Sequence, residues 1–347
     1  MKIGFLIYGS LDILSGGYMY DRKLVEYLRS QGDTVEIISL PWRNYAAHLT
    51  DNITFKLPRN FDILVQDELN HPSLIGANRG GHSCPIISLV HHLRCSELRP
   101  HWQNVFYRAI ERKYLQNVDG FIFNSRTTRS VVDGLLVHMK PSIIAYPPTD
   151  RLGEVISMEA IHKRSRQNPF RILFLGNVIE RKGLHTLLDA VSRLPAVFKL
   201  DIVGSLTTEP KYAKHMQDRV LASGLSSFVK FHFSLDHEQL KTILRAAHVL
   251  VVPSSYEGFG IVYLEGMAFG LPAIGTTAGA AGEIISHETD GFLIEPGDSD
   301  SLADRLRVLN EKRKVLLHMS LAARERYNRQ PKWHQTAGQI REFLRSF

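Results

Sequence analysis

The sequence predicts an α/β protein built from two Rossmann-like, doubly wound domains. Its 347 residues suit two domains, because one domain usually holds roughly 100–200 residues. Short apolar runs, typical of buried parallel strands, alternate with helical patterns in both halves of the chain. We therefore expect one domain over residues 1–150 and another over 170–330, facing each other across a cleft that binds a ligand.

The first domain is expected to begin with a strand at Ile3–Tyr8, a short apolar run. A helix follows at Tyr20–Ser30, because its apolar residues recur at helical spacing and Gly32 ends the pattern. The remaining elements alternate in the same way. Strands are expected at 35–40, 63–65, 86–90 and 120–123, and helices at 102–114 and 126–136.

A break then separates the two domains. The run Tyr146–Asp150 (YPPTD) cannot continue a helix or a central strand, because proline lacks the backbone N–H that either would need. The polar stretch that follows ends in HKRSRQNP and predicts an interdomain linker over 151–169. After it the alternation restarts. Strands are expected at 170–175, 199–203, 229–233, 249–252 and 272–275, and helices at 183–194, 212–223, 240–247 and 261–269.

Composition and charge exclude several classes of protein. Hydrophobic residues make up 44% and charged residues 22%, which is typical of a globular chain and not of a disordered one. The formal net charge is +7, and nine Lys or Arg stand against three Glu between residues 311 and 347. No nucleic-acid-binding module or interleaved aromatics accompany this charge. The segment therefore predicts either a solvated helical face or contact with an acidic membrane surface or partner.

Cysteine usage and hydropathy favour a cytoplasmic protein. Cys84 and Cys95 are too few for a disulfide framework and unsuited to a zinc cluster, so reduced thiols are expected. No apolar run approaches the roughly 20 residues of a membrane span. The apolar N-terminus leads into Gly16-Gly17 without a small-residue cleavage site, which predicts a strand rather than a signal peptide. Peripheral attachment to the inner face of a membrane stays open.

The most informative stretch is Val252–Gly291. Within it, Glu257 and Glu265 are separated by seven residues, and the turn Gly258-Phe259-Gly260 leads from a strand end into a helix. Glycine lets a backbone approach a ligand, and the first N–H groups of the helix, from Ile261 onward, would form an anion site suited to phosphate. Glu265 could reach a ribose diol, and Glu257 could accept hydrogen bonds from sugar hydroxyls. Two surface carboxylates are the alternative.

A second stretch, Leu173–Leu188 (LFLGNVIERKGLHTLL), places two cations in a loop. A strand is expected to end at Gly176 and a helix to begin near Gly183. Arg181 and Lys182 then lie at the carboxyl end of a strand, where ligands bind in open α/β sheets. A cation at this place can neutralise a diphosphate as charge develops on it. A basic loop facing solvent is the alternative.

Two features of the first domain could add to such a site. Gly16-Gly17 follows the first strand and suits close approach to a phosphate or a sugar, but it lacks the pattern of a nicotinamide-binding loop. His91 follows an apolar strand, and a neutral imidazole there could bond a sugar hydroxyl or steer a leaving group. A histidine in this position is also often structural, and the glycine pair alone is a weak signal.

The sequence does not predict a metal site. Asp298-Ser299-Asp300 matches an Asp-x-Asp metal signature, but it precedes a helical run in which Asp is an ordinary N-cap. The histidines show no metal-ligand spacing. Charge neutralisation would then fall to Lys182 and to helix amides.

Taken together, these segments resemble a known family. Glu257–Glu265 with its GFG turn, followed by GLPAIGTTAGAAGEI and DGFLIEPGD, is similar to the retaining GT-B glycosyltransferases of family 4, the glycosyl transferases group 1. The resemblance covers essentially the whole chain and is most specific between Phe170 and Asp298. It implies a nucleotide-sugar donor mainly on the C-terminal domain and an acceptor on the N-terminal one. It also implies that a last helix, within residues 331–347, crosses back to the N-terminal domain.

The resemblance further implies roles for individual residues. Glu257 would hold the donor sugar, Glu265 the ribose, and Lys182 the diphosphate. Gly258, Phe259 and Gly260 would line the phosphate turn, His91 would sit by the sugar, and Gly16 and Gly17 would face the donor phosphates; Glu283 is less securely placed. No metal or other cofactor is implied. Retention would arise from front-face transfer in which the leaving phosphate assists deprotonation of the acceptor.

One position departs from the family pattern. An arginine usually follows the glycine that matches Gly176, and here that position is Asn177. Arg181 could supply the second cation from another direction. The departure leaves room for a nucleotide-sugar binding protein with a degenerate site. Another GT-B enzyme, such as a sugar-nucleotide epimerase or a phosphorylase, is a further alternative.

The donor is expected to be a UDP- or GDP-sugar, with base contacts around Val229–Phe233. A carbohydrate or a lipid-linked molecule is expected as acceptor, and no nucleic acid is expected as a partner. A basic, aromatic stretch in the first domain would suit a lipid acceptor. It consists of Arg94, Arg99, Trp102, Phe106, Arg108, Arg112 and Lys113. An amphipathic helix with its apolar side in the core is the alternative.

Overall fold

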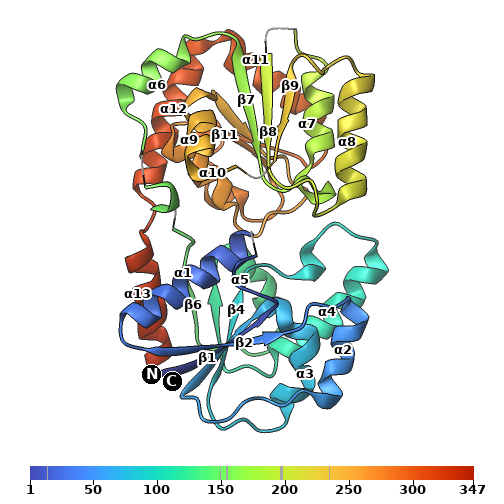
Figure 1. The fold of residues 1–347 in the computed structure, drawn as a ribbon, viewed down its shortest axis with the longest axis vertical. Helices are drawn as coiled ribbons and strands as arrows, with labels where there is room; N and C mark the ends of the chain where they lie inside the picture. The colour runs from blue at the N-terminus through green and yellow to red at the C-terminus, as the bar shows by residue number, and fades with distance from the viewer. Residues whose placement is uncertain (14, 149, 154, 196–197, 234) are drawn as a thin grey trace. The chain divides into compact units, whose positions relative to one another are not determined.

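A computed structural model describes residues 1–13, 15–148, 150–153, 155–195, 198–233 and 235–347. The chain divides into two compact units (Figure 1). Unit 1 comprises Met1–Pro148 and Pro331–Phe347, and unit 2 comprises Thr149–Gln330. Each unit has its own six-stranded sheet in which all paired strands are parallel. The predicted α/β class with two doubly wound sheets is therefore confirmed.

The sheet of unit 1 has the strand order β2-β1-β3-β4-β5-β6. Its strands are β1 (Lys2–Tyr8), β2 (Thr34–Leu40), β3 (Ile63–Asp67), β4 (Ile86–Val90), β5 (Gly120–Phe123) and β6 (Ser142–Ile144). Because β1 pairs with both β2 and β3, the strand order reverses at this point. Open α/β sheets bind ligands beyond the carboxyl ends of the strands at such a reversal.

Two apolar cores cover the two faces of this sheet. On one face, Ile3, Phe5 and Ile7 of β1 pack against Leu24 and Leu28 of α1 (Gly16–Ser30). On the other face, alternate residues of the same strand pack against α3 (His71–Arg79), α4 (His101–Leu115) and α5 (Arg126–Asp133). Burial on both faces explains why the strands are nearly continuous apolar runs.

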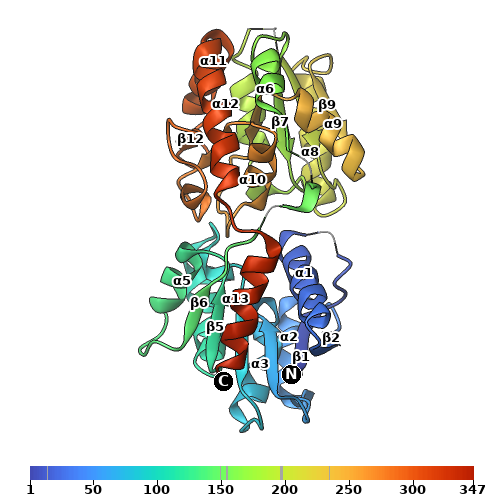
Figure 2. The ribbon, with the colours of Figure 1, turned by 90° about the vertical axis from the view of Figure 1, so that its left-hand side faces the viewer.

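The last helix of the chain belongs to unit 1. Ala337, Ile340 and Leu344 of α13 (Trp333–Arg345) enter the same core as α1, and Figure 2 shows the two helices side by side. Arg341 donates a hydrogen bond from Nε to Oδ2 of Asp33 at 2.6 Å. Asp33 also accepts a bond from the N-terminal amine at 2.9 Å. These contacts join the two ends of the chain within one unit.

Unit 2 has the strand order β12-β11-β10-β7-β8-β9. Its strands are β7 (Phe170–Leu175), β8 (Phe198–Val203), β9 (Val229–His232), β10 (Val249–Val251), β11 (Ala273–Thr276) and β12 (Gly291–Ile294). The helices are α6 (Met158–Ser165), α7 (Leu184–Val191), α8 (Pro210–Ala222), α9 (His237–Ala246), α10 (Ile261–Ala268), α11 (Ser299–Glu311) and α12 (Arg313–Asn328). Among the described residues, every helix is too short or too polar to cross a bilayer.

The structure departs from the predicted linker over 151–169, a range that includes Glu154, outside the described residues. Much of it is helix α6, which belongs to unit 2. Ser157 caps this helix by accepting a hydrogen bond from the N–H of Ala160. Arg164, 4% exposed, donates to the carbonyl oxygens of Phe269 and Gly270, both at 2.7 Å. The basic residues of this range suggested a linker, yet one of them, Arg164, is buried and anchors the helix to unit 2.

Other elements also lack a predicted counterpart. These are α2 (Tyr45–Thr54), α3, β6, β12 and α12. The basic segment over residues 311–347 contains the last residue of α11 and the whole of α12 and α13. Leu316, Met319 and Ala323 are buried in α12, so that helix has one face in the core of unit 2.

Candidate functional site

The site in unit 2 centres on an ion pair between Lys182 and Glu257. Lys182 ends a short 3₁₀ turn, Glu180–Lys182, that follows β7, and Glu257 lies in the loop between β10 and α10. The lysine Nζ is 2.6 Å from Oε2 of Glu257. Ser254 donates to the same oxygen at 3.0 Å. The two side chains are 13% and 10% exposed, so both charges are largely removed from water.

Burial and pairing act together on these two groups. Burial lowers the pKa of Lys182 below its ordinary value, while Glu257 opposes that effect. Burial alone would raise the pKa of Glu257, but Lys182 and Arg181 outweigh it, and that pKa is lowered. Glu257 is therefore ionised near neutral pH, and a charged Lys182 supplies the counter-charge that this carboxylate needs in a low-dielectric place.

The backbone of Glu257 packs against the backbone of Gly279. The two residues form a parallel bridge, and the N–H of Ala280 donates to the Glu257 carbonyl at 2.7 Å. Gly279 has φ +82°, and a Cβ there would lie 2.2 Å from the carbonyl oxygen of Glu257. Only glycine fits at this contact. The glycine-rich run after β11 thus fixes the loop that carries the carboxylate.

The GFG turn leads into α10 as predicted. Gly260 is the N-cap of this helix in a left-handed conformation, and no side chain caps the helix. The first N–H groups, beginning at Ile261, are therefore at an end that favours an anion. Glu265 lies on the second turn of the same helix and is 2% exposed. Phe259 is 5% exposed, so its ring packs inside the unit.

Arg181 and Asn177 occupy the loops around the lysine. A Cβ at Gly176 would lie 3.7 Å from Cε of Lys182, which places the Gly176-Asn177 turn beside the lysine stem. Asn177 is half-buried. Arg181 donates from Nη1 to the carbonyl oxygen of Tyr256 at 2.7 Å. The guanidinium therefore supports the residue before Glu257, whereas a phosphate-binding cation was the expectation for it.

In unit 1 the structure brings Gly16, Gly17 and His91 together. We predicted a loop for the two glycines, but they form the first turn of α1. Ser15 caps this helix by accepting a hydrogen bond from the N–H of Tyr18 at 3.2 Å. The helix begins earlier than its apolar pattern indicates, because its first two residues are glycines, which add no side chain to that pattern. A Cβ on Gly17 would lie 3.2 Å from Cδ2 of His91, so the imidazole packs against the first turn.

Two residues beside His91 were missed in the sequence. Asp21 accepts a hydrogen bond on Oδ1 from Nε2 of His91 at 2.9 Å. Asp67 ends β3 next to this pair and is 4% exposed. Asp21 lies four residues after Gly17, hence on the same face of α1, which is a signal that could have linked it to the glycine pair. The meeting of α1, β3 and β4 could not be read from spacing.

The prediction that Asp298 caps a helix is confirmed, because it accepts a hydrogen bond from the N–H of Ser301 at 2.9 Å. Two groups in unit 1 do contain the residue types of a cation site, Asp21–Asp67–His91 and Glu68–His71–Glu111. In each, the histidine is already engaged with a carboxylate, at 2.9 Å in the first and 3.0 Å in the second. In the second group burial lowers the pKa of His71 and raises the pKa of Glu68 to about 8, so this contact is not an ion pair near neutral pH.

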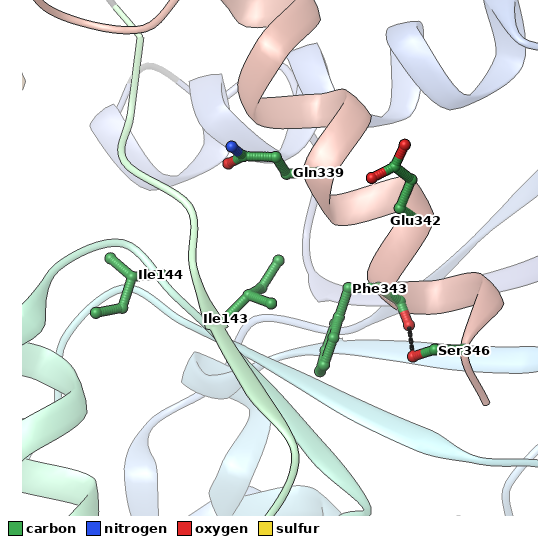
Figure 3. A pocket seen from close by; sticks show the side chains of 6 residues that line it. All are labelled: Ile143, Ile144, Gln339, Glu342, Phe343 and Ser346. Carbon is green, nitrogen blue, oxygen red and sulfur yellow. Dashed lines mark hydrogen bonds between the residues drawn. The ribbon is translucent and has the colours of Figure 1, made fainter.

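A surface hollow of about 470 Å³ lies elsewhere in unit 1 (Figure 3). Ile143 and Ile144 of the edge strand β6 form one side, and Gln339, Glu342, Phe343 and Ser346 of α13 and its end form the other. None of these residues was predicted to bind a ligand. The hollow lies at the edge of the sheet, away from the strand-order reversal.

Part of unit 2 is similar to a known protein family. Residues 158–326 match the family described as Glycosyl transferases group 1. An uncharacterized glycosyltransferase of Methanocaldococcus jannaschii is 35% identical over 134 residues, which are 38% of this chain and 33% of that protein. The first curated relatives are matched over 33–42% of their own length.

Solved structures match over the entire chain. Sucrose-phosphate synthase from Thermosynechococcus elongatus has a TM-score of 0.82 at 20% identity and covers 99% of this chain and 98% of its own. Anabaena HepE, solved in complex with UDP and glucose, has a TM-score of 0.78 at 20% identity and 100% coverage of both chains. The fold is that of the GT-B glycosyltransferases. With the family match, it supports a group 1 glycosyltransferase.

Proposed function

We propose that this chain is a retaining glycosyltransferase of family 4 that moves a hexosyl group from a nucleotide-sugar to an acceptor hydroxyl without a metal. The observation that carries the proposal is the buried Lys182–Glu257 pair, 2.6 Å apart, beside the uncapped N-terminus of α10. A cation, a helix N-terminus and two buried carboxylates are what a sugar diphosphate requires from a protein. The lysine and the helix match the anionic phosphates, and the carboxylates match the hydroxyls.

The residues of unit 2 take separate parts in this proposal. Lys182 and the Gly258–Ile261 turn bind the diphosphate, Glu265 bonds the ribose and Glu257 bonds the transferred sugar. In the free protein Glu257 keeps Lys182 ordered and charged. Phosphate oxygens then offer the lysine a second partner. The lysine stabilises the charge that develops on the leaving diphosphate.

His91 and the first turn of α1, with Gly16 and Gly17, would contribute from unit 1 by the family pattern. In the transfer, the bond from the anomeric carbon to the leaving phosphate oxygen breaks. A bond from the acceptor oxygen to the same carbon forms on the same face. The acceptor proton passes to the leaving phosphate. No protein nucleophile and no metal is required for this sequence.

UDP-sugars are the favoured donors, because HepE has been solved with UDP and glucose and shares this fold. GDP-sugars are the second choice. The test is thermal shift with UDP, GDP, ADP and dTDP sugars, each with and without EDTA, since a ligand of the native state raises the melting temperature. A rise with one nucleotide that EDTA leaves unchanged supports the proposal. No rise with any of them contradicts it.

Two other functions remain in view because Asn177 replaces the usual arginine. A nucleotide-sugar binding protein would give the thermal shift and no product with any acceptor. Product mass separates the enzymes: transfer adds a hexose to the acceptor, epimerisation leaves the donor mass unchanged, and phosphorolysis consumes free phosphate. If Asn177 weakens the site, Asn177→Arg is expected to tighten donor binding.

A lipid-linked acceptor at a membrane surface is supported by α4. Trp102 and Phe106 are 70% and 47% exposed, so the alternative that buries the apolar side of this stretch is wrong for these two side chains. Arg108, Arg112 and Lys113 are exposed on the same helix. Arg94 instead stacks on Tyr107 and Tyr45, with its guanidinium carbon 4.8 and 5.1 Å from their ring centroids.

We expect this surface to bind anionic vesicles. Apolar side chains enter the interface while the cations meet anionic headgroups, each worth about 1 kcal/mol. The protein should sediment with phosphatidylglycerol vesicles at modest salt. The double variant Trp102→Ala and Phe106→Ala should stay in the supernatant. Leu221→Ala on α8, at a residue 66% exposed, is the control and should have no effect. Failure of the unaltered protein to sediment would remove the membrane proposal.

A further inference from the structure

The imidazole of His91 lies against an unusual concentration of buried acids. Asp21 on α1 is fully buried, and Asp67 and Glu68 at the end of β3 are 4% and 3% exposed. One oxygen of Asp21, one of Asp67 and a ring nitrogen of His91 lie within 4.8 Å of one another. Tyr20 meets the ring edge-on at 5.4 Å, and Asn124 and Thr128 contact the His91 carbonyl.

Only one nitrogen of the His91 ring has a hydrogen-bond partner in the part of the chain that the structure describes. Nε2 of His91 is bound to Oδ1 of Asp21 at 2.9 Å, and Oδ2 of Asp21 is buried without a hydrogen-bond partner. Asp67 accepts only the N–H of Leu69, at 3.0 Å, among the hydrogen bonds described for its side chain. Among the described residues, no partner accompanies the other ring nitrogen, Nδ1. Nδ1 is therefore the atom that can meet a ligand.

The charge state of the ring decides what Nδ1 can do. In a neutral ring with its proton on Nε2, Nδ1 is an acceptor with a lone pair. In the protonated ring, Nδ1 is a donor that carries part of a positive charge. Phosphate oxygens need the second form. A sugar hydroxyl can meet either form.

Burial of several acids beside one histidine favours the protonated ring. A single carboxylate out of water is costly unless a cation pairs with it. A proton on His91 neutralises Asp21, and a proton on Asp67 removes the repulsion between the two carboxylates. The first turn of α1 opposes this only weakly, since its dipole disfavours a nearby cation.

We propose that Asp21 is a positioning residue that holds His91 as an imidazolium, with Asp67 retained as its neutral acid, so that Nδ1–H of His91 is a cationic hydrogen-bond donor for a ligand of unit 1. This inference rests on the proposed function for the identity of the ligand. It corrects the neutral imidazole expected from the sequence.

The expected titration agrees with the geometry. Burial lowers the pKa of His91, but Asp21, Asp67 and Glu68 more than reverse this and raise it to about 9. Burial, and then the charge of Asp21, raise the pKa of Asp67 to about 8. Burial raises the pKa of Glu68 to about 8 as well. At pH 7 His91 is thus expected to be an imidazolium.

The test is the imidazole ¹⁵N spectrum of the whole protein between pH 5 and 10, without substrate. We expect His91 to show two protonated nitrogens at pH 7.5 and to titrate near pH 9. In Asp21→Asn, which removes the charge and keeps the shape, its midpoint should fall by roughly two pH units, a 100-fold loss of proton affinity. Glu97→Gln is the matched control, because Glu97 bonds the neighbouring His92 at 3.0 Å, and it should leave His91 unchanged.

A neutral His91 at pH 7 in the unaltered protein would overturn the inference, and this result does not depend on the variant folding. The second readout is the pH profile of kcat/KM, whose alkaline limb should move to lower pH in Asp21→Asn. A purely structural Asp21 would lower the rate at every pH and leave that limb in place. A protonated His91 in a protein that transfers no sugar would overturn the proposed function alone.

Discussion

Replacing Lys182 by methionine is expected to lower kcat/KM for sugar transfer about 100- to 1,000-fold, the usual cost of removing one preorganised donor to a developing oxyanion. The lysine Nζ lies 2.6 Å from Glu257, in a place where both charges are largely buried. Because this contact fixes the position of the lysine, the cation does not have to move when charge develops on the diphosphate. The measurement is initial rate against donor concentration, with a fall mainly in kcat because the interaction is strongest in the transition state.

Loss of the cation also leaves Glu257 buried without its partner. Breaking a buried pair from one side costs about 3–5 kcal/mol, so part of the lost rate could come from unfolding. The double variant Lys182→Met with Glu257→Gln removes both charges and should melt higher than the single lysine variant. Its activity should stay low. That combination separates catalysis from stability.

Lys211→Met, at an exposed lysine of α8 in the same unit, is the control and should change neither rate nor melting temperature. Unaltered turnover in Lys182→Met would show that the lysine has no part in the reaction. The roles given to Glu257 and the α10 turn would then need a different cation.

The fold was readable because most of its strands are buried on both faces. Ile86–Val90 and Phe170–Leu175 are runs that only a covered parallel strand explains, and the structure gives them the same bounds. Helix α6 was not readable, because it buries one large apolar side chain, Ile161, and its other main anchor to the core is Arg164. A basic residue that bonds two carbonyls has the same appearance in a sequence as one in a solvated linker.

The site was readable in unit 2, where it is local. Glu257, Gly260 and Glu265 are close in sequence, and a strand, a turn and a helix place them without help from distant residues. The contact of Lys182 with Glu257 joins segments 75 residues apart, yet both follow strands that are neighbours in the sheet. In unit 1 the deciding partners of His91, Asp21 and Asp67, lie 70 and 24 positions before it in the chain. Their type and number, which set the charge of the imidazole, come from packing alone.

Substituting Gly279 by alanine is expected to impair both stability and activity, because the loop of Glu257 has no room for a side chain there. The left-handed backbone of Gly279 costs a non-glycine residue about 1–3 kcal/mol. The added Cβ would also lie 2.2 Å from the carbonyl oxygen of Glu257 and 2.7 Å from its nitrogen. These are backbone atoms that cannot rotate away, so the loop itself must move.

A shift of about 1 Å in a positioning loop can cost roughly 100-fold in rate, and we expect a loss of that order in kcat/KM at temperatures where the variant is folded. Gly282→Ala is the matched control in the same run, since a Cβ there meets only Leu293, at an ordinary 3.6 Å. It should leave rate and melting temperature close to those of the unaltered protein. A Gly279→Ala protein with full activity would show that Glu257 can move without consequence, and its proposed hold on the sugar would fail. Equal losses in both variants would instead point to the flexibility of the glycine-rich run as the property that matters.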